Sequence, residues 1–538
     1  MADNSNPGVA PVPTPWWSGA VGYEVYIRSF ADSTGDGVGD LRGIESHLDH
    51  IAWLGARIVW ITPFMPSPGF DHGYDVSDYR DIDPAHGSMD DFRRLVERAH
   101  DLDLRVLVDI VPNHTSSAHP WFIDSISGPD SARRDWYHWA DPGPDGGPPN
   151  NWVSHFGGPA WTLDPASGQY YCHLFLPEQP DLNWSNPAVV EEFDDVLRFW
   201  CDAGADGFRI DVAHALLKHP ELLDNPVIRA TEPEAGPTAV FESFRHDHDL
   251  DQDANIEIFR RWRRLTEPYG AMLVGEVNVR TPQRAARYTA PGALDTVFYL
   301  KPAWADWEPS ALVDMLRSTH DADPDGVSWT MNSHDTSRSV SRFGGGEVGR
   351  RRSFAATAFE FVLGGVPFLY QGEELGLVDA TLDPGDRADP IWTRNAGGEA
   401  GRDGSRSAMP WTTGSANGFS TGTPWLAAAE RPAEETVEHQ RGAADAPVHA
   451  YRALISARAA NPDLHLAPLE WLSVDRDDAA AGRRGDCAFV ANLGSESITV
   501  DLVGDHEIVF CSTPDGAMVH GSEVTVAPET TVYLRRTS

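Results

Sequence analysis

A chain of 538 residues is longer than one hydrophobic core usually supports, so two or three domains are expected. Hydrophobic residues make up 41% of the chain, which indicates a globular protein and excludes a largely disordered one. The formal net charge of -39 would repel nucleic acid and anionic membrane surfaces, so neither is expected as a partner.

The start of the chain, its longest apolar stretch and its cysteines together predict a cytoplasmic protein. Segment 1–17 is polar and rich in proline, and it lacks the basic start and apolar core of a signal peptide. The stretch 354–372 is interrupted by Glu360, two glycines and a proline, so it predicts a buried helix followed by a buried strand rather than a membrane span. The four cysteines show no metal-ligand spacing and are typical of reduced core residues.

Eight short apolar runs recur along the chain, and amphipathic segments lie between several of them. The runs occupy 22–30, 56–63, 105–112, 207–213, 272–277, 295–300, 328–335 and 366–372. Strands that alternate with helical segments predict parallel strands joined by crossover helices. Eight such units favour an α/β fold of the (β/α)8 TIM barrel type, although a doubly wound open sheet also fits the pattern.

Two insertions and a change of pattern complete the expected organisation. A long stretch rich in tryptophan, glycine and proline follows the third run, and it predicts an inserted lobe. Short alternating apolar runs near the C-terminus predict a small antiparallel β domain. The expected domains are barrel segments 15–113 and 183–460, the lobe (domain B) 114–182, an insertion near 373–423, and the β domain 461–538.

Ionisable side chains gather at the C-terminal ends of the predicted strands. They are Asp109, His114, Arg209, Asp211, Glu276, His334 and Asp335. Arg209 and Asp211 share one face of their strand because strand side chains repeat every two residues. The C-terminal ends of barrel strands converge on one mouth, where such residues can form an active site; ion pairs that only cap the strands are the alternative. Carboxylates without a cysteine–histidine metal set predict glycoside chemistry.

Four segments resemble, in order, the motifs of the α-amylase family of glycoside hydrolases, in its α-glucosidase and oligo-1,6-glucosidase branch. They are DIVPNHTS, GFRIDVAH, GEVNV and NSHDTSR, and QPDLNW and GVPFLYQGEELG match two secondary motifs. The resemblance extends from about Trp16 to the C-terminal β domain. It implies that Asp211 is the nucleophile, that Glu276 is the general acid/base, and that Asp335 is the third carboxylate, which stabilises the transition state.

The resemblance also implies a pocket for one terminal glucose. In FDHGYD, Asp71 would bind hydroxyl groups and Tyr74 would stack on the sugar ring. In GRDGSRSAMPW, Arg406 would work with Asp71 to close the end of the pocket. The remaining positions assigned to substrate binding are His114, Phe156, Phe175, Arg209, Val212 and His334. Val212 goes with α-1,6 cleavage in this branch, but His214 stands where asparagine is usual, so the linkage stays open.

The turn DSTGDGVGD at 32–40 carries oxygen ligands at alternate positions. They belong to Asp32, Thr34, Asp36, Val38 through its carbonyl group, and Asp40. A glycine-rich turn with alternating oxygens suits a hard cation. The resemblance implies a structural calcium or magnesium ion here, and an acidic turn without metal is the alternative. No organic cofactor is expected.

The expected function is a retaining, exo-acting α-glucosidase that releases glucose from the non-reducing end of short α-glucosides of the maltose, isomaltose or sucrose type. One alternative is an α-transglucosylase that uses the same covalent intermediate. Another is a non-catalytic barrel homologue, such as the ancillary chains of amino-acid transporters, but those lose the carboxylates that this sequence retains. The expected partners are small α-glucosides, and the sequence indicates no particular oligomeric state.

Overall fold

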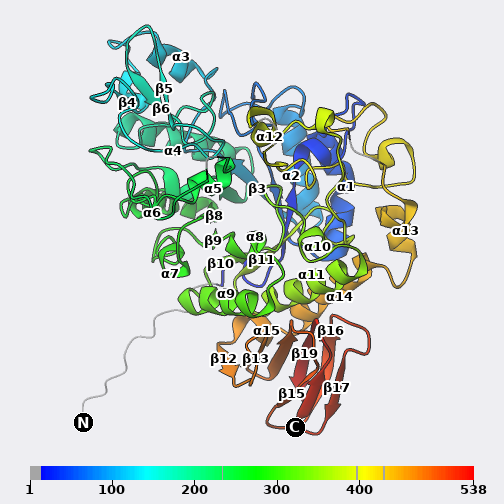
Figure 1. The fold of residues 1–538 in the computed structure, drawn as a ribbon. Coiled ribbons are helices and arrows are strands. Elements are labelled where there is room, and N and C mark those ends of the chain that lie inside the picture. The colour runs from blue at the N-terminus through cyan, green and yellow to red at the C-terminus, as the bar shows by residue number, and fades with distance from the viewer. Residues whose placement is uncertain (1–13, 233, 396–397, 428–429, 538) are drawn as a thin grey trace, which may run out of the picture.

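The computed structural model describes residues 14–232, 234–395, 398–427 and 430–537. Eight parallel strands close into a barrel in the order β1-β11-β10-β9-β8-β7-β3-β2 (Figure 1). They are β1 (Gly22–Val25), β2 (Ile58–Ile61), β3 (Arg105–Ile110), β7 (Gly207–Ile210), β8 (Met272–Glu276), β9 (Thr296–Phe298), β10 (Val327–Trp329) and β11 (Val366–Tyr370). The predicted TIM barrel is confirmed, and an open sheet is excluded because β1 pairs with both β2 and β11.

The longer helices surround the barrel. They are α1 (Leu41–Leu54), α2 (Met89–Asp101), α4 (Pro187–Asp202), α6 (Asn255–Thr266), α9 (Pro309–Ala322), α11 (Gly346–Glu360) and α14 (Pro447–Ala460). Helix α1 shows why such segments fold locally: the Asp40 side chain accepts a backbone N–H at its start, and Gly55 ends it in the left-handed conformation. Ile44, Leu48 and Ile51 recur on its buried face. Helix α11 leads into β11, as predicted for the apolar stretch.

The barrel interior is filled by apolar side chains. Trp60, Leu107, Val274, Phe298 and Phe368 belong to one buried cluster. The Phe368 ring occupies the space beside Gly22, where a Cβ atom would lie 2.2 Å from it. Because this layer is apolar, charged groups are left to the strand ends, which is where the sequence carries them.

The predicted lobe forms a small structure between β3 and β7 (Figure 1). It contains α3 (Pro120–Ile126) and an antiparallel sheet of β4 (Trp139–Ala140), β6 (Tyr170–Cys172) and β5 (Trp161–Leu163). The segment after β11 contains α12 (Pro390–Arg394). The other short helices are α5 (Pro237–Phe241), α7 (Pro282–Ala285), α8 (Lys301–Trp304), α10 (Ser339–Arg342), α13 (Val437–Gly442) and α15 (Asp463–Leu466).

The C-terminal part is antiparallel, as predicted. One sheet contains β12 (Leu469–Leu472), β13 (Ala479–Arg484), β14 (Cys487–Asn492), β19 (Thr530–Arg536) and β16 (His506–Cys511). A second contains β15 (Ile498–Asp501), β18 (Glu523–Val526) and β17 (Ala517–His520). Thr531 donates from its hydroxyl group to the Ala355 carbonyl of α11, which joins this domain to the barrel. Figure 1 shows it at the opposite end of the molecule from the lobe.

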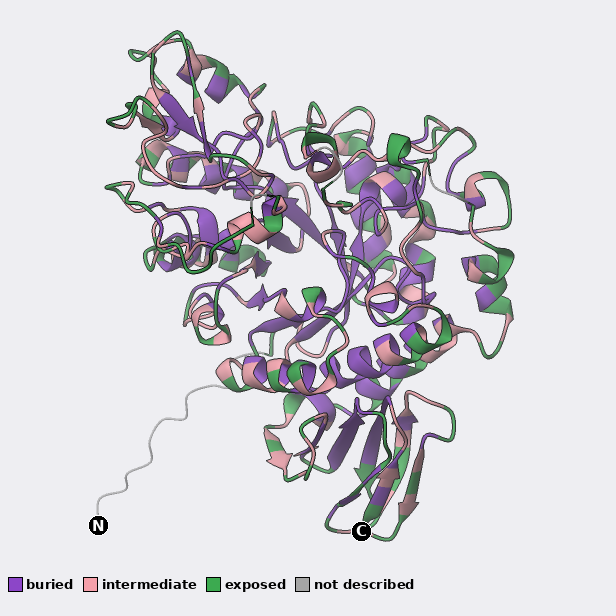
Figure 2. Ribbon diagram, viewed as in Figure 1, coloured by how far each residue is buried: buried purple, intermediate pink, exposed green. Residues whose placement is uncertain are grey.

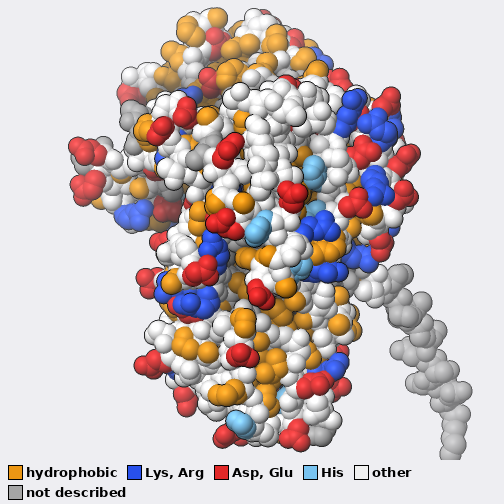
Figure 3. All heavy atoms as spheres, turned by 90° about the vertical axis from the view of Figure 1, so that its right-hand side faces the viewer, with side chains coloured by type: hydrophobic (Ala, Val, Ile, Leu, Met, Phe, Trp, Pro, Cys, Tyr) orange, Lys and Arg blue, Asp and Glu red, His pale blue; other side chains and the backbone are white. Residues whose placement is uncertain are grey.

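Burial follows these layers. Figure 2 shows buried residues along the barrel strands and the inner sides of the helices, with exposed residues on the outer loops. Acidic and basic side chains are interspersed on the face drawn in Figure 3. All four cysteines are free, and three of them are buried. Within the described ranges, no helix is both long and apolar enough to cross a membrane.

Candidate active site

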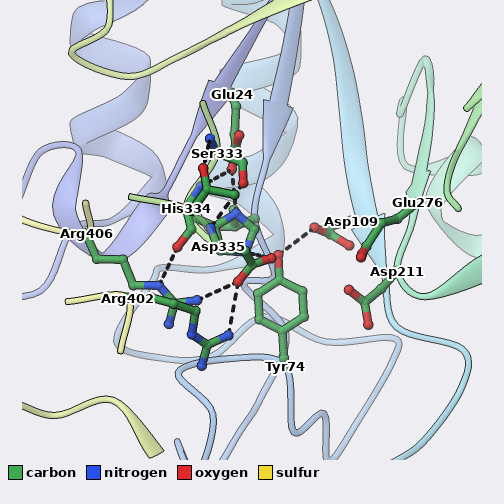
Figure 4. Close-up of polar contacts among 12 residues, drawn as sticks. Glu24, Tyr74, Asp109, Asp211, Glu276, Ser333, His334, Asp335, Arg402 and Arg406 are labelled. Atoms are coloured by element: carbon green, nitrogen blue, oxygen red, sulfur yellow. Dashed lines mark hydrogen bonds and ion pairs between the residues drawn. The ribbon is translucent and has the colours of Figure 1, made fainter. Parts of the chain in front are cut away.

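Strand register brings four charged side chains together at the mouth of the barrel. Asp109 on β3 lies directly opposite Arg209 on β7, and Glu276 ends the next strand, β8. Arg209 donates from Nη1 to both Asp109 oxygens at 3.1 Å and to Asp211 at 2.7 Å. Its Nη2 lies 2.5 Å from Glu276. Figure 4 shows the three carboxylates facing one another. We call these four residues the Arg209 cluster.

Exposure separates the roles that these carboxylates can take. The side chain of Glu276 is 13% exposed and that of Asp211 is 7% exposed, whereas Asp109 is fully buried. A substrate can therefore reach the first two but not Asp109. A cavity lined by Arg209 and Glu276 also reaches His334 and Asp335. Two of the three predicted catalytic residues, Glu276 and Asp335, thus border a common space, and Arg209 joins Asp211 to it.

The Arg209 cluster sets three carboxylates against one guanidinium. Burial raises the pKa of Asp211, the charge of Arg209 opposes this, and the charges of Glu276 and Asp109 raise it further. Burial also raises the pKa of Asp109 to about 6. One positive charge thus faces three carboxylates in a buried site, and the pKa values of Asp211 and Asp109 are both raised. A retaining glycosidase needs two carboxyl groups at its site, one ionised and one protonated.

Backbone strain marks the residue after Asp211. Val212 has φ 42° and ψ 43°, a left-handed conformation that is unfavourable for a β-branched side chain. The Asp211 amide donates to the Ile110 carbonyl at 2.8 Å, and the Val212 amide lies 3.4 Å from a Glu276 oxygen. These contacts hold the sharp turn in which β7 ends directly after the carboxylate.

A second group of charges surrounds Asp335 in the loop after β10 (Figure 4). Its Oδ1 accepts from Arg402 Nη1 at 3.0 Å and from Arg406 Nη2 at 2.9 Å. Its other oxygen lies 3.2 Å from His334 Nε2, and His334 Nδ1 lies 2.5 Å from Glu24. Burial alone would raise the pKa of Asp335, but His334, Arg402 and Arg406 hold it well below its usual range. Asp335 is therefore ionised.

The arginine that contacts Asp71 differs from the prediction. Arg402 Nη2 donates to Asp71 Oδ1 at 2.8 Å, whereas Arg406 turns to Asp335 and donates from Nε to the His334 carbonyl at 2.8 Å. The predicted pair of Arg406 and Asp71 was therefore wrong. Both arginines lie in the motif GRDGSRSAMPW, and a loop motif has no periodicity that shows which side chain crosses the pocket.

Sequence reasoning missed a further carboxylate at this arginine. Arg402 Nε donates to Asp389 Oδ2 at 2.6 Å. We call Asp71, Asp335, Asp389 and Arg402 the Arg402 cluster. Arg402 could have been noted because it is the other arginine of the motif. Asp389 lies outside every motif, and nothing in the sequence pointed to it.

The remaining predicted binding residues surround the two clusters. The Tyr74 hydroxyl donates to Asp109 at 3.1 Å, and its ring stacks on His334 with centroids 5.3 Å apart. His114 Nε2 lies 3.1 Å from Gln179 Nε2, which donates to Asp71 at 3.3 Å.

Two aromatic residues come from the lobe. The Phe156 ring lies 5.4 Å from the Arg402 guanidinium, and the Phe175 ring lies 5.0 Å from that of His114. The structure thus brings the predicted residues together, while their individual roles stay predictions.

The turn at 32–40 is closed by its own hydrogen bonds. The Asp32 carboxylate accepts the amides of Thr34, Gly35 and Gly37 at 2.7–2.8 Å, and Asp40 caps α1. Among the residues that the structure describes, no three histidine, cysteine, aspartate or glutamate side chains group as metal ligands. The Asp36 side chain accepts from the Val38 amide at 2.9 Å. A calcium or magnesium ion in this turn stays a prediction.

Comparison with known proteins agrees with this geometry. Residues 24–466 match the family described as "Alpha amylase, catalytic domain". A probable alpha-glucosidase of Rhizobium meliloti is 41% identical over 85% of this chain and 85% of its own length. An oligo-1,6-glucosidase of Parageobacillus thermoglucosidasius is 36% identical over 82% of this chain and 83% of its own. The solved structure of XgtA, an alpha-glucosyl transfer enzyme, has a TM-score of 0.89 at 36% identity and covers 97% of this chain and 100% of its own.

Proposed function

Because the chain belongs to the α-amylase family of glycoside hydrolases, we propose that it is a retaining, exo-acting α-glucosidase that acts on short α-glucosides. The observation that carries this proposal is the Arg209 cluster. One guanidinium contacts both Asp211 and Glu276, the two carboxylates of the cluster that a substrate can reach.

The reaction proceeds in two steps through a covalent intermediate. Asp211 attacks the anomeric carbon, the bond to the leaving oxygen breaks, and Glu276 gives its proton to that oxygen. Glu276, now ionised, takes a proton from water as the water oxygen attacks the anomeric carbon and releases Asp211. Two inversions retain the α configuration. Asp335, ionised between two arginines, faces the positive charge that develops on the sugar ring.

The exo preference rests on the ion pair between Asp71 and Arg402. The two side chains meet at 2.8 Å, and Asp71 is 5% exposed and Arg402 15% exposed. In this proposal they bind the hydroxyl groups of the terminal glucose and leave no room for a further sugar beyond it. A longer chain then enters only by its non-reducing end, so the substrates are short glucosides of the maltose, isomaltose or sucrose type.

Transfer to an acceptor other than water is the second candidate activity. The similarity to XgtA, an alpha-glucosyl transfer enzyme, favours it. The same covalent intermediate would react with a sugar or alcohol hydroxyl group in place of water. We also propose a cytoplasmic location, which the four free cysteines support.

Product analysis tests the proposal directly. Proton NMR of the first product from maltose, isomaltose or sucrose is expected to show α-glucose, and chromatography of a starch digest is expected to show slow release of glucose alone. A β anomer would refute Asp211 as the nucleophile. Early release of long maltodextrins would refute the closed pocket.

A further inference from the structure

Asp389 lies outside every motif of the sequence yet contacts Arg402 in two ways. Its Oδ2 accepts from the Arg402 side chain at 2.6 Å and from the Arg402 backbone amide at 2.9 Å. Its Oδ1 accepts from the Ile391 amide at 2.8 Å and so caps helix α12. Asp389 is fully buried, so no substrate can reach it, and its contacts act through Arg402 and α12.

The three contacts of Arg402 determine how its guanidinium lies. Nε, Nη1 and Nη2 each meet a different carboxylate, at Asp389, Asp335 and Asp71 respectively. Asp335 and Asp71 belong to the proposed glucose site. Asp389 lies in the same segment after β11 as Arg402 and holds the guanidinium at Nε. An arginine side chain has many rotamers, and a bond to Nε removes the rotation that would carry both terminal nitrogens away from their partners.

The surrounding backbone is built for a close approach to Asp389. Gly401 has φ 71°, and a Cβ atom there would lie 2.8 Å from the Cβ atom of Asp389. The Asp389 amide and the Ala388 amide both donate to Asp403, at 3.1 and 2.8 Å. Burial would raise the pKa of Asp389, but Arg402 and Arg406 hold it well below its usual range. The carboxylate is therefore charged and fixed.

The helix that Asp389 caps also contacts the lobe. At its end, Asn395 donates from its side chain to the Phe156 carbonyl at 3.2 Å, and Arg394 lies 3.4 Å from Glu178. Phe156 in turn lies against the Arg402 guanidinium. One carboxylate thus joins the loop that carries Arg402 to the helix that contacts the lobe.

We propose that Asp389 is a positioning residue for glucose recognition, which holds Arg402 so that one guanidinium contacts Asp71 and Asp335 together and closes the end of the pocket. This inference rests on the proposed function. Without the charge at Asp389, Arg402 adopts other rotamers, Asp71 loses its partner, and binding of the terminal glucose weakens more than the chemical step.

The variant Asp389→Asn tests this, because it keeps the volume and an oxygen for the helix cap but loses the charge. We expect kcat/KM for a short glucoside to fall about 10- to 100-fold, mainly through KM. Maltotriose is expected to release some disaccharide from its non-reducing end, because the pocket is no longer closed. Asp389→Ser, which caps a helix but cannot reach Arg402, should behave in the same way.

The matched control is Thr436→Ala, which removes the side-chain cap of α13; the Thr436 side chain bonds to Ala433 and His439 and to neither cluster. It should lower the unfolding temperature without changing KM. The proposal is overturned if Asp389→Asn leaves KM and products as in the wild type, or if its activity falls only in proportion to its folded fraction.

A binding measurement separates this inference from the proposed function. Calorimetry with 1-deoxynojirimycin, an iminosugar analogue of terminal glucose, needs no turnover. Asp389→Asn should weaken its binding about 10- to 100-fold relative to the wild type. If the wild type binds the iminosugar but hydrolyses no α-glucoside, the proposed function fails while the role of Asp389 is still measured. Equal binding by both proteins refutes the role of Asp389.

Discussion

The Arg209 cluster and the Arg402 cluster each place one arginine among three carboxylates, but they are built from different parts of the fold. The Arg209 cluster lies on the barrel strands β3, β7 and β8, or directly after them, and its geometry follows from their hydrogen-bonded register. The members of the Arg402 cluster come from the loops after β2, β10 and β11 and from the start of α12. In the proposed mechanism, rigid strands thus carry the reacting groups, and loops carry the groups that would recognise the sugar.

The two clusters also differ in their protonation. In the Arg209 cluster, burial and neighbouring carboxylates raise the pKa of Asp211. Beside the Arg402 cluster, Arg406 brings a second guanidinium to Asp335, and the pKa of Asp335 is held well below its usual range. The pKa of Asp389 is likewise held low, whereas burial raises that of Asp71 although Arg402 contacts it, so the opposite shifts distinguish Asp211 from Asp335 and Asp389. The reaction needs a mobile proton on one side and a fixed negative charge on the other.

Removing a reacting carboxylate should have the largest effect. Asp211→Asn and Glu276→Gln are each expected to lower kcat by a factor on the order of 10³ or more, because each loses a group that forms a bond in the reaction. Turnover of purified, folded variants on a short glucoside measures this, and the exposed Asp130→Asn is the control for the change of charge. Near wild-type turnover in either variant would contradict the assignment.

Exchanging each arginine for lysine in turn should distinguish the roles of the two guanidinium groups that contact Asp335. Arg402→Lys keeps the charge but loses the fork that joins Asp71 and Asp335, so we expect kcat/KM to fall about 10- to 100-fold and longer products to appear. Arg406→Lys has no contact with Asp71 to lose and should leave the product length unchanged. Longer products from Arg406→Lys alone would favour the pair that was first predicted from the sequence.

The pH profile should respond to the Arg209 cluster alone. Asp211 must be ionised to attack, so activity is lost as the pH falls through its pKa, and the charge of Asp109 raises that pKa. Asp109→Asn should therefore move the acid limb of kcat/KM to lower pH, whereas Arg402→Lys should leave it in place. An acid limb that moves to higher pH would contradict the proposed coupling between Asp109 and Asp211.

The smallest effect is expected at the turn 32–40, which is connected to the loop of Asp71 through Trp425. Trp425 donates its amide to Gly37 at 2.8 Å, and its ring lies 5.0 Å from that of His72. If an ion binds there at 100 times its Kd, its removal costs about 2.7 kcal/mol of folding free energy. Chelation should then lower the Tm and leave kcat nearly unchanged, with Asp36→Asn as the variant that no longer responds. An unchanged Tm in chelator would indicate a turn closed only by its hydrogen bonds.

The parts of the molecule that could be predicted are those in which local sequence carries the pattern. The eight apolar runs coincide with the eight barrel strands, and residues spaced by two, such as Arg209 and Asp211, share a strand face. The loop residues follow no such periodicity, so their partners could not be predicted in this way. The motif containing Arg402 and Arg406 predicted an arginine near Asp71 but selected the wrong one, and nothing in the sequence indicated Asp389.

The sequence by itself determined the order of strands and helices and the identity of the groups at the strand ends, because strand and helix periodicity is a local property of the chain. Closure into a barrel rather than an open sheet was shown by the pairing of β1 with both β2 and β11. Only the tertiary structure decided which charges meet. The pair of Asp71 and Arg402 joins residues 331 positions apart, and that of Arg209 and Glu276 joins residues 67 positions apart. Contacts between neighbouring strands could be anticipated, because the strand register fixes them. Contacts between loops depend on how their side chains pack in three dimensions, which the local sequence does not show.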